Sequence, residues 1–186
     1  LLNFKLYYQN TKWSYMLNRL LLLCLIVIFF ACKEKKSTVI INEREVKESL
    51  IEINRAKVRL ENNQIDSYVN RHGWPVLTTG TGLRYYIYES GKGTTAKPNM
   101  TATVEYCVTL LSGDTAYTSR ESGPQDFLIN MDNVESGLHE GIQYMKVGDR
   151  AKLVLPSYLA HGLVGDSKKI PPRTSIVYDI KLVSLR

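Results

Sequence analysis

From Gly80 to the C-terminus, the sequence contains short runs in which apolar and polar residues alternate. Residues typical of turns separate these runs. In Thr101–Leu111, alternate residues such as Val104, Tyr106 and Val108 share one face of an extended chain, which is typical of a half-buried strand. Strands are predicted at Leu83–Glu89, Thr101–Leu111, Phe127–Ile129, Arg150–Leu155 and Ser175–Leu185. Turn pairs such as Gly113-Asp114 and Gly148-Asp149 lie between them, so the pattern predicts an antiparallel sheet.

One segment of this region has a helical period instead. In Ser136–Met145, the apolar residues Leu138, Ile142 and Met145 lie on a single face. A sheet with one apolar-faced helix packed on it is an α+β fold. The chain has 186 residues and is 44% hydrophobic, which is enough to bury a real core. Residues 80–186 are therefore predicted to form one compact α+β domain.

A second, longer helix is predicted before this domain. Val46, Leu50, Ile53 and Leu60 recur at helical spacing between charged residues, and Asn42 is a plausible N-cap. The helix should begin at Glu43 and end near Asn62, or near Asn70 with a break in between. Its narrow apolar stripe can pack on the domain or pair with a second copy of the chain. Residues 43–79 are thus predicted to be an amphipathic helix and a linker.

The N-terminus has the pattern of an export signal. Leu20–Phe30 is an apolar run that is too short to span a bilayer, which takes ~20 residues. Met16 precedes it as a plausible start, so residues 1–15 are predicted to be upstream translated sequence and 16–31 a signal peptide. The run ends at Ala31-Cys32, which resembles the lipobox of bacterial lipoproteins. Cys32 is therefore predicted to carry acyl chains, with residues 32–42 as a tether; the alternative is a buried core cysteine.

Charge and side-chain spacing exclude several classes of partner. Half of the net charge of +6 lies in residues 1–31, whereas residues 80–186 hold 12 basic and 11 acidic residues without a basic cluster. Such a domain lacks the electrostatic pattern of a nucleic-acid-binding protein. No spacing of His, Cys, Asp and Glu suggests a metal site, and no cofactor motif is present. Cys107 lies in a predicted strand and is expected to be an inert packing residue.

The domain resembles the FKBP-type peptidyl-prolyl isomerases over roughly Leu83–Arg186. The resemblance rests on short motifs that occur in the family's order and spacing. These are Val104-Glu105-Tyr106, Gly113 before Tyr117, Gly137 and Gly141, Met145 to Arg150, Leu155-Pro156, Ala160-His161-Gly162, Ile170-Pro171-Pro172, and Ile176 to Ile180. It implies an antiparallel FKBP-like sheet wrapped on one short helix. It also implies isomerase activity on Xaa-Pro segments of client proteins, with no cofactor or metal.

The resemblance also implies a set of site residues. Tyr106 and Tyr117 match a pocket Tyr and an aromatic wall, and Tyr178 matches a second aromatic wall. The remaining catalytic positions are Val134 and Glu135, whose backbone N–H holds a substrate carbonyl, Leu138 at the pocket floor, His161 at a donor position on the rim, and Ile170 at an aliphatic rim. Phe127, Thr118 and Gln125 are assigned to substrate binding, with Phe127 either in the core or near the pocket.

Four of these positions depart from the family pattern. Leu138 replaces a frequent Trp, His161 a Tyr, Thr118 an Asp and Gln125 an aromatic residue. The pocket is therefore expected to be shallower, with reduced activity and poor affinity for the family's macrolide inhibitors. Tyr106 and Tyr178 also fit the pattern of core aromatics, and His161 that of a surface loop residue.

The leader and upstream helix narrow the expected function. Together they resemble the Bacteroidetes gliding-motility-associated isomerase lipoproteins. The chain is expected to assist folding of exported envelope proteins while lipid-anchored through Cys32 at the inner or outer membrane, facing the periplasm. Two alternatives are a catalytically weak FKBP-like binding module or chaperone, and a scaffold lipoprotein of an envelope machine. In the scaffold case, residues 43–62 would contact a second copy or an envelope partner.

Overall fold

The computed structural model describes residues 42–186. The predictions for residues 1–41, which include the signal-like run Leu20–Phe30 and the lipidation site Cys32, lie outside the described residues. Lys47–Arg186 form one compact unit, and the contacts described below lie within it. No helix in residues 42–186 is both long and apolar enough to cross a membrane.

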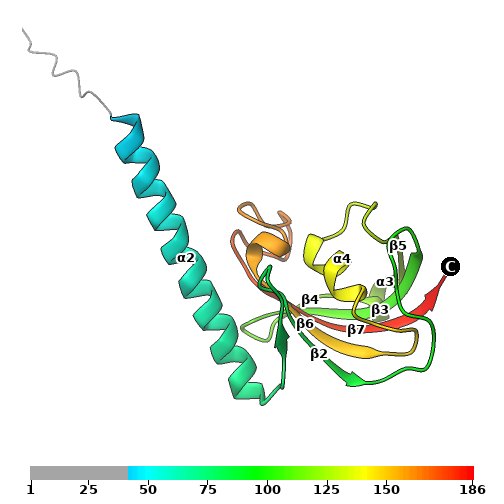
Figure 1. Cartoon of the computed structure of the whole chain (residues 1–186). Helices are drawn as coiled ribbons and strands as arrows, with labels where there is room; N and C mark the ends of the chain where they lie inside the picture. The colour runs from blue at the N-terminus through cyan, green and yellow to red at the C-terminus, as the bar shows by residue number, and fades with distance from the viewer. Residues whose placement is uncertain (1–41) are drawn as a thin grey trace, which may run out of the picture. The chain divides into compact units, whose positions relative to one another are not determined.

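The described chain forms one antiparallel sheet with helices on both of its faces (Figure 1). In the order β1-β2-β6-β7-β3-β4, neighbouring strands are hydrogen-bonded, and β5 pairs with β3 on the edge that β4 also uses. The strands are β1 (Leu77–Thr78), β2 (Arg84–Glu89), β3 (Thr101–Leu110), β4 (Thr115–Thr118), β5 (Gln125–Leu128), β6 (Arg150–Leu155) and β7 (Ile176–Leu185). The helices are α2 (Glu43–His72), α3 (Ser119–Ser122), α4 (Ser136–Ile142) and the 3-10 turn η1 (Ser157–Leu159).

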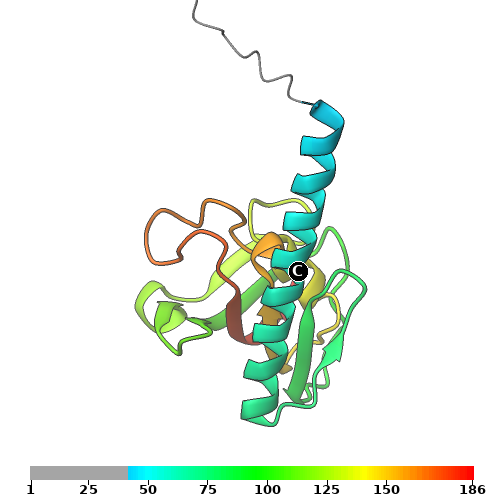
Figure 2. The same ribbon diagram turned by 90° about the vertical axis from the view of Figure 1, so that its left-hand side faces the viewer.

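Strand alternation divides the apolar residues of the central strands between the two faces. In β6, Leu153 and Leu155 belong to the main core with α4, whereas Val154 between them belongs to a second cluster with α2. In β7, Tyr178 faces the main core and Val177 faces α2. Because both strands are buried on both faces, they form a three-layer arrangement of α2, sheet and α4, which Figures 1 and 2 show from two sides.

Helix α4 lies unusually close to the sheet because glycines face β6. A Cβ atom on Gly137 would lie 2.6 Å from the Cγ of Leu155, and one on Gly141 would lie 2.6 Å from a Cδ atom of Leu153. Leu138 and Ile142, on the same helix, are fully buried in the main core. The sequence prediction of a short helix with one buried face is therefore confirmed, and its glycines have a packing role.

Helix α2 corrects the sequence prediction in two respects. It runs without a break to His72, so it ends later than Asn62 or Asn70. The predicted stripe of Val46, Leu50, Ile53 and Leu60 does not pack on the sheet; all four side chains are exposed. The buried residues are instead Ile65, Tyr68 and Val69, in the C-terminal half of the helix. The prediction that this stripe packs on the domain was wrong because only the C-terminal half of the helix lies over the sheet.

Polar contacts also fasten α2 to the domain. The carboxylate of Glu61 accepts hydrogen bonds from Ser157 N (2.6 Å), Ser157 Oγ (3.1 Å) and Ser175 Oγ (2.6 Å). Arg84, whose side chain is buried, pairs with Asp66 at 2.7 Å. These contacts tie the helix to β2 and to the segments that follow β6 and precede β7.

Replacing Glu61 with alanine is expected to lower the free energy of unfolding by about 2 kcal/mol. The substitution leaves a half-buried backbone N–H and two hydroxyls without their shared acceptor, and hydrogen bonds to charged groups are worth ~1.5–3 kcal/mol. Glu52→Ala, at an exposed position of the same helix, is the matched control and should change stability by less than ~0.5 kcal/mol. Urea denaturation measures the free energy of unfolding of both variants. Equal effects of the two substitutions would contradict the role of Glu61 in fastening α2 to the domain.

The five predicted strands agree with the observed ones to within two residues at every end, and Arg150–Leu155 agrees at both ends. The sequence analysis missed β1, β4 and α3. These elements have two to four residues, which is too short for any periodicity to show. They form because neighbouring strands and the N-cap residue Thr118 support them.

Candidate active site

A cleft of about 380 Å³ lies at the start of α4, where six separate segments meet. It is lined by Tyr106, Val108, Tyr117, Gln125, Asn133, Val134, Glu135, Ser136, Ala160, His161 and Tyr178. Strands β3, β4, β5 and β7 provide one side of it, and the loops before α4 and after η1 provide the other. The tertiary fold thus brings together seven of the eleven residues that the resemblance implied.

Two tyrosines from β3 and β7 form one wall of the cleft. The rings of Tyr106 and Tyr178 lie 6.2 Å apart and are tilted by 55°. Tyr178 is only 6% exposed, and its hydroxyl donates to Glu135 Oε2 at 3.0 Å. Burial raises the pKa of Tyr178 well above its usual value, and the neighbouring carboxylate raises it further. Tyr178 therefore remains a neutral donor, with its ring held in a fixed position.

The side chain of Glu135 joins the two sides of the cleft. One carboxylate oxygen accepts from Tyr178, and the other lies 2.9 Å from Nε2 of His161. Because a carboxylate only accepts hydrogen bonds, Nε2 of His161 must carry the proton that it shares with Glu135. A neutral His161 has then used its single N–H and can offer Nδ1 only as an acceptor. The expected role of His161 as a donor to substrate stays a prediction, and with this pairing it requires the protonated ring.

Tyr117, on β4, is held by Asp166 from the loop between η1 and β7. Its hydroxyl donates to one oxygen of Asp166, and the other oxygen accepts from the backbone N–H groups of Lys168 (2.9 Å) and Ile170 (2.8 Å). Gly165 precedes this turn with φ of +70°, and a Cβ there would lie 2.2 Å from the carbonyl oxygen of Ile170. Only glycine fits this position, so the local sequence shapes the loop that orients Tyr117.

The pKa of Asp166 is lowered to about 2 although burial raises it, because the hydrogen bonds from Tyr117, Ile170 and Lys168 outweigh burial. A carboxyl with a lowered folded-state pKa stabilises the fold above its unfolded value of 3.8, and that contribution is lost as pH falls toward 2. We therefore expect the melting temperature of the native chain to fall more steeply between pH 4 and pH 2 than that of Asp166→Asn. Thermal denaturation across this range tests the expectation, and parallel pH profiles would contradict it.

Four of the predicted site residues do not line the cleft. Leu138 and Ile170 are buried in the main core behind it. Phe127 is also a core residue, with its ring 5.7 Å from that of His139. Thr118 caps helix α3, where its hydroxyl accepts from Arg120 N at 3.3 Å. The core positions support the cleft from behind and do not face it, whereas Gln125 does line it as predicted.

Sequence reasoning missed two side chains that shape the cleft. It assigned Glu135 a role only through its backbone, although the carboxylate makes the contacts described above. It did not identify Asp166 at all. Its place after Gly165 is a turn signal, since Asp often accepts from the backbone two residues ahead, but the contact with Tyr117 spans 49 positions. No local signal predicts a contact of that range.

Comparisons with known proteins identify relatives of this domain. Residues 92–183 match the family model described as FKBP-type peptidyl-prolyl cis-trans isomerase. FK506-binding protein 1 of Dictyostelium discoideum is 30% identical over 106 residues, which cover 56% of this chain and 99% of that protein. FkpA, an FKBP-type peptidyl-prolyl cis-trans isomerase of Escherichia coli (strain K12), is 39% identical over 114 residues. That match covers 60% of this chain, which spans about 40% of the length of this relative.

Solved structures show the same similarity in three dimensions. The crystal structure of FkpA from Escherichia coli superposes with a TM-score of 0.61 at 32% identity, covering 77% of this chain and 68% of that chain. A peptidyl-prolyl cis-trans isomerase from Pseudomonas syringae superposes with a TM-score of 0.60 at 27% identity, covering 70% and 94%. The observed α+β fold is therefore one that other proteins share.

Proposed function

Because the chain belongs to the FKBP-type peptidyl-prolyl cis-trans isomerase family, we propose that it catalyses rotation about Xaa-Pro peptide bonds in the cleft lined by Tyr106, Tyr117 and Tyr178. The observation that carries the proposal is the convergence of these three tyrosines from three strands on one hollow of the family's domain. A proline ring can pack against aromatic walls of this kind.

The chemistry requires no nucleophile. Amide resonance sets a barrier of ~18–20 kcal/mol to rotation about the C–N bond, and water favours the charge-separated planar amide. A cleft that excludes water removes this preference and so favours the twisted amide, whose nitrogen has lost its resonance. A ten-thousandfold acceleration needs the barrier to fall by only about 5.5 kcal/mol. Aromatic walls and a few fixed polar groups are sufficient for that change.

Individual residues have distinct proposed roles in this reaction. The rings of Tyr106, Tyr117 and Tyr178 enclose the proline, and the backbone at Val134 and Glu135 binds the preceding carbonyl, as the family resemblance implies. The carboxylate of Glu135 holds Tyr178 and His161 in place and thereby keeps the two sides of the cleft at a fixed separation.

The proposal is tested by measuring cis-trans exchange of a proline peptide by NMR or in a protease-coupled assay. The full chain should accelerate exchange in proportion to its concentration, whereas heat-denatured protein should not. No acceleration above the uncatalysed rate would overturn the enzyme proposal.

One observation favours the second candidate, a binding module or chaperone with weak catalysis. Glu135, His161 and the exposed Gln125 place polar groups in a cleft that must exclude water for efficient catalysis. In that case, proline peptides would bind and shift NMR resonances of cleft residues without faster exchange. The same titration therefore separates the two candidates.

We further propose that the protein works at the cell envelope, on exported proteins, as a lipoprotein anchored through Cys32. The support is the apolar run Leu20–Phe30 followed by Ala31-Cys32. Mass spectrometry of the mature protein should find an acylated Cys32 at the N-terminus. A mature form that retains Phe29 and Phe30 would overturn lipid anchoring.

The finer proposal is a role in gliding motility, which rests on the resemblance of the leader and helix to the gliding-motility-associated isomerase lipoproteins. Deletion of the gene in its own host should abolish colony spreading, and the wild-type gene should restore it. Complementation by the Tyr178→Leu variant would favour a scaffold role, in which residues 43–62 contact a second copy or an envelope partner. Unimpaired spreading of the deletion strain would overturn the motility role.

A further inference from the structure

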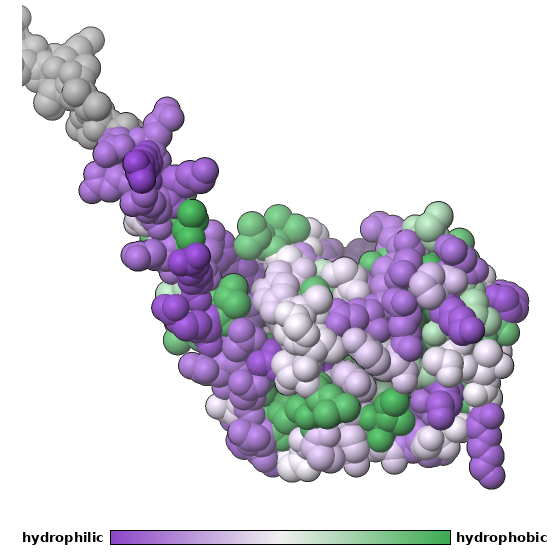
Figure 3. Space-filling model, in the orientation of Figure 1, coloured by the Kyte–Doolittle hydropathy of each residue, from purple (hydrophilic) through white to green (hydrophobic). Residues whose placement is uncertain are grey.

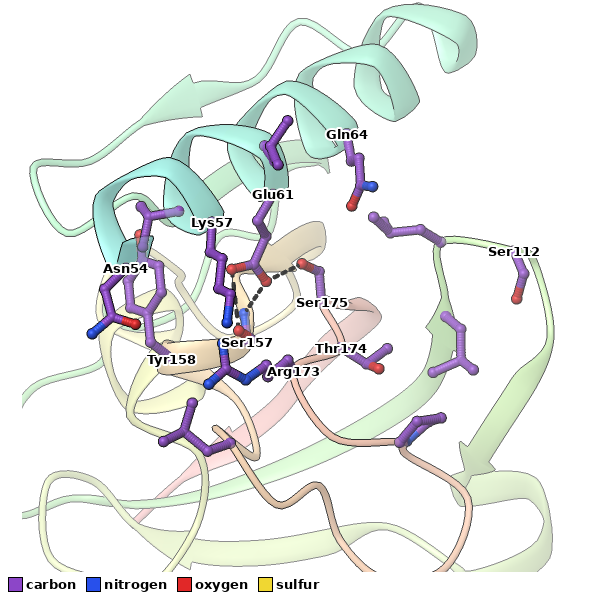
Figure 4. A pocket seen from close by; sticks show the side chains of 16 residues that line it. Asn54, Lys57, Glu61, Gln64, Ser112, Ser157, Tyr158, Arg173, Thr174 and Ser175 are labelled. Carbon is purple, nitrogen blue, oxygen red and sulfur yellow. Dashed lines mark hydrogen bonds between the residues drawn. The ribbon is translucent and has the colours of Figure 1, made fainter. Parts of the chain in front are cut away.

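A second hollow, larger than the tyrosine-lined cleft, lies along helix α2. This groove has a volume of about 730 Å³ and is bounded by Asn54–Gln64 of α2, the end of β3, and the segments around Ser157–Leu163 and Pro171–Ser175 (Figure 4). All of its lining residues belong to the compact unit Lys47–Arg186. None of them lines the tyrosine cleft, so the groove is a separate site.

The walls of the groove carry apolar side chains that remain exposed. Leu60 on α2 is 63% exposed, and Leu163 on the opposite loop is 68% exposed. Val58, Leu111 and Pro171 continue the apolar lining. Figure 3 shows apolar patches on both the helix and the neighbouring part of the domain, among hydrophilic side chains. Apolar residues that face one another across a hollow favour the binding of apolar side chains.

The charges in the groove are unbalanced in favour of positive charge. Lys57 extends from α2, and Arg173 enters from the opposite wall (Figure 4). Among residues 42–186, neither cation has a carboxylate within ion-pair distance. The single lining carboxylate, Glu61, is already occupied by its hydrogen bonds from Ser157 and Ser175. An acidic side chain in the groove would therefore find two cations without partners.

The groove and the tyrosine cleft share one dividing segment. Ser157, Tyr158 and Leu163 face the groove, whereas Ala160 and His161, between them in sequence, face the cleft. A peptide bound in the groove would thus hold its neighbouring residues close to the cleft. Tethering of this kind raises the effective concentration of the second binding event.

We propose that this groove is a second client-binding site, which takes an extended segment that carries apolar residues and an acidic residue and delivers a nearby proline to the cleft. The inference rests on the proposed isomerase function and adds to it a client preference. The occupant is a segment of an unfolded client, because exposed apolar walls and two cations that no carboxylate of residues 42–186 pairs match an apolar, acidic stretch of chain.

The test uses the full chain and three fluorescein-labelled peptides that each contain one Ala-Pro bond. One is a tetrapeptide, one adds a Leu-Asp-Leu-Leu segment after a short spacer, and one adds Leu-Lys-Leu-Leu instead. We expect kcat/KM for the Asp peptide to exceed that for the tetrapeptide by about tenfold through tethering. The increase in kcat/KM over the tetrapeptide should be much smaller for the Lys peptide. Fluorescence anisotropy measures binding of the same peptides independently of catalysis.

Charge reversal provides the decisive variants. In the double variant Lys57→Glu/Arg173→Glu, the Lys peptide and no longer the Asp peptide should have the higher kcat/KM. Leu163→Asp should reduce the increase in kcat/KM over the tetrapeptide for both peptides. Activity on the tetrapeptide should stay within twofold of wild type in each case. Lys97→Glu and Leu77→Asp, at exposed positions outside the groove, are the matched controls and should change neither preference.

Each outcome bears on one proposal. An unchanged peptide preference in the charge-reversal variant would overturn the groove as a client site. The proposal would also be overturned if sedimentation showed that the wild-type chain is a dimer and the groove variants are monomers, while peptide binding is the same in both. A second copy of the chain would then be the occupant of the groove. Absent activity on the tetrapeptide with intact, charge-dependent binding of the Asp peptide would instead overturn the isomerase function and leave the binding site in place.

Discussion

Replacement of Tyr178 by leucine is expected to reduce kcat/KM for a proline tetrapeptide by about a hundredfold, which corresponds to ~2.7 kcal/mol of barrier lowering. The substitution removes an aromatic wall of the cleft, together with the hydroxyl that donates to Glu135. It therefore widens the cleft, admits water, and frees the carboxylate that also holds His161. Exchange rates from NMR, measured on the full chain, provide the readout.

Tyr178→Phe is the matched control, because it keeps the ring and removes only the donor. We expect a smaller loss of about three- to tenfold, since the ring remains packed and only the hydrogen bond to Glu135 is lost. Circular dichroism must show that both variants are folded. Equal activity of Tyr178→Leu and wild type would place the reaction outside this cleft.

Replacement of Phe127 by alanine should lower the free energy of unfolding by about 3–5 kcal/mol, the usual cost of truncating a buried aromatic residue. Phe127 is 1% exposed and is packed in the main core, beside β3 in the sheet and with its ring against His139 of α4. The variant should also retain its kcat/KM per folded molecule at low temperature, because Phe127 does not line the cleft. Urea denaturation and the peptide assay measure the two quantities.

Met131→Ala is the comparison for this stability effect, since Met131 is a large apolar residue that is 67% exposed. It should change the free energy of unfolding by less than ~0.5 kcal/mol. If Phe127→Ala lost activity while it remained folded, Phe127 would contribute to substrate binding, as the family resemblance implied, and not only to the core.

Several features of this protein follow from local sequence alone. The alternation in Thr101–Leu111 predicts a strand because a pleated chain sends successive side chains to opposite faces, and β3 has the same apolar face. The helical spacing of Leu138, Ile142 and Met145 predicts α4 for the corresponding reason. The family motifs identify Tyr106, Tyr117 and Tyr178, which the fold brings to one cleft.

Only the tertiary structure decided which side chains meet. The stripe from Val46 to Leu60 has the right spacing to be buried, yet it stays exposed because the sheet lies under Ile65, Tyr68 and Val69. The links from Glu135 to Tyr178 and from Tyr117 to Asp166 join residues that are 43 and 49 positions apart. Periodicity records which face a residue occupies, but not what lies opposite that face. The sequence therefore determined the longer strands, the two main helices and the family resemblance, whereas the packing of distant segments determined the polar framework of the cleft and the groove beside α2.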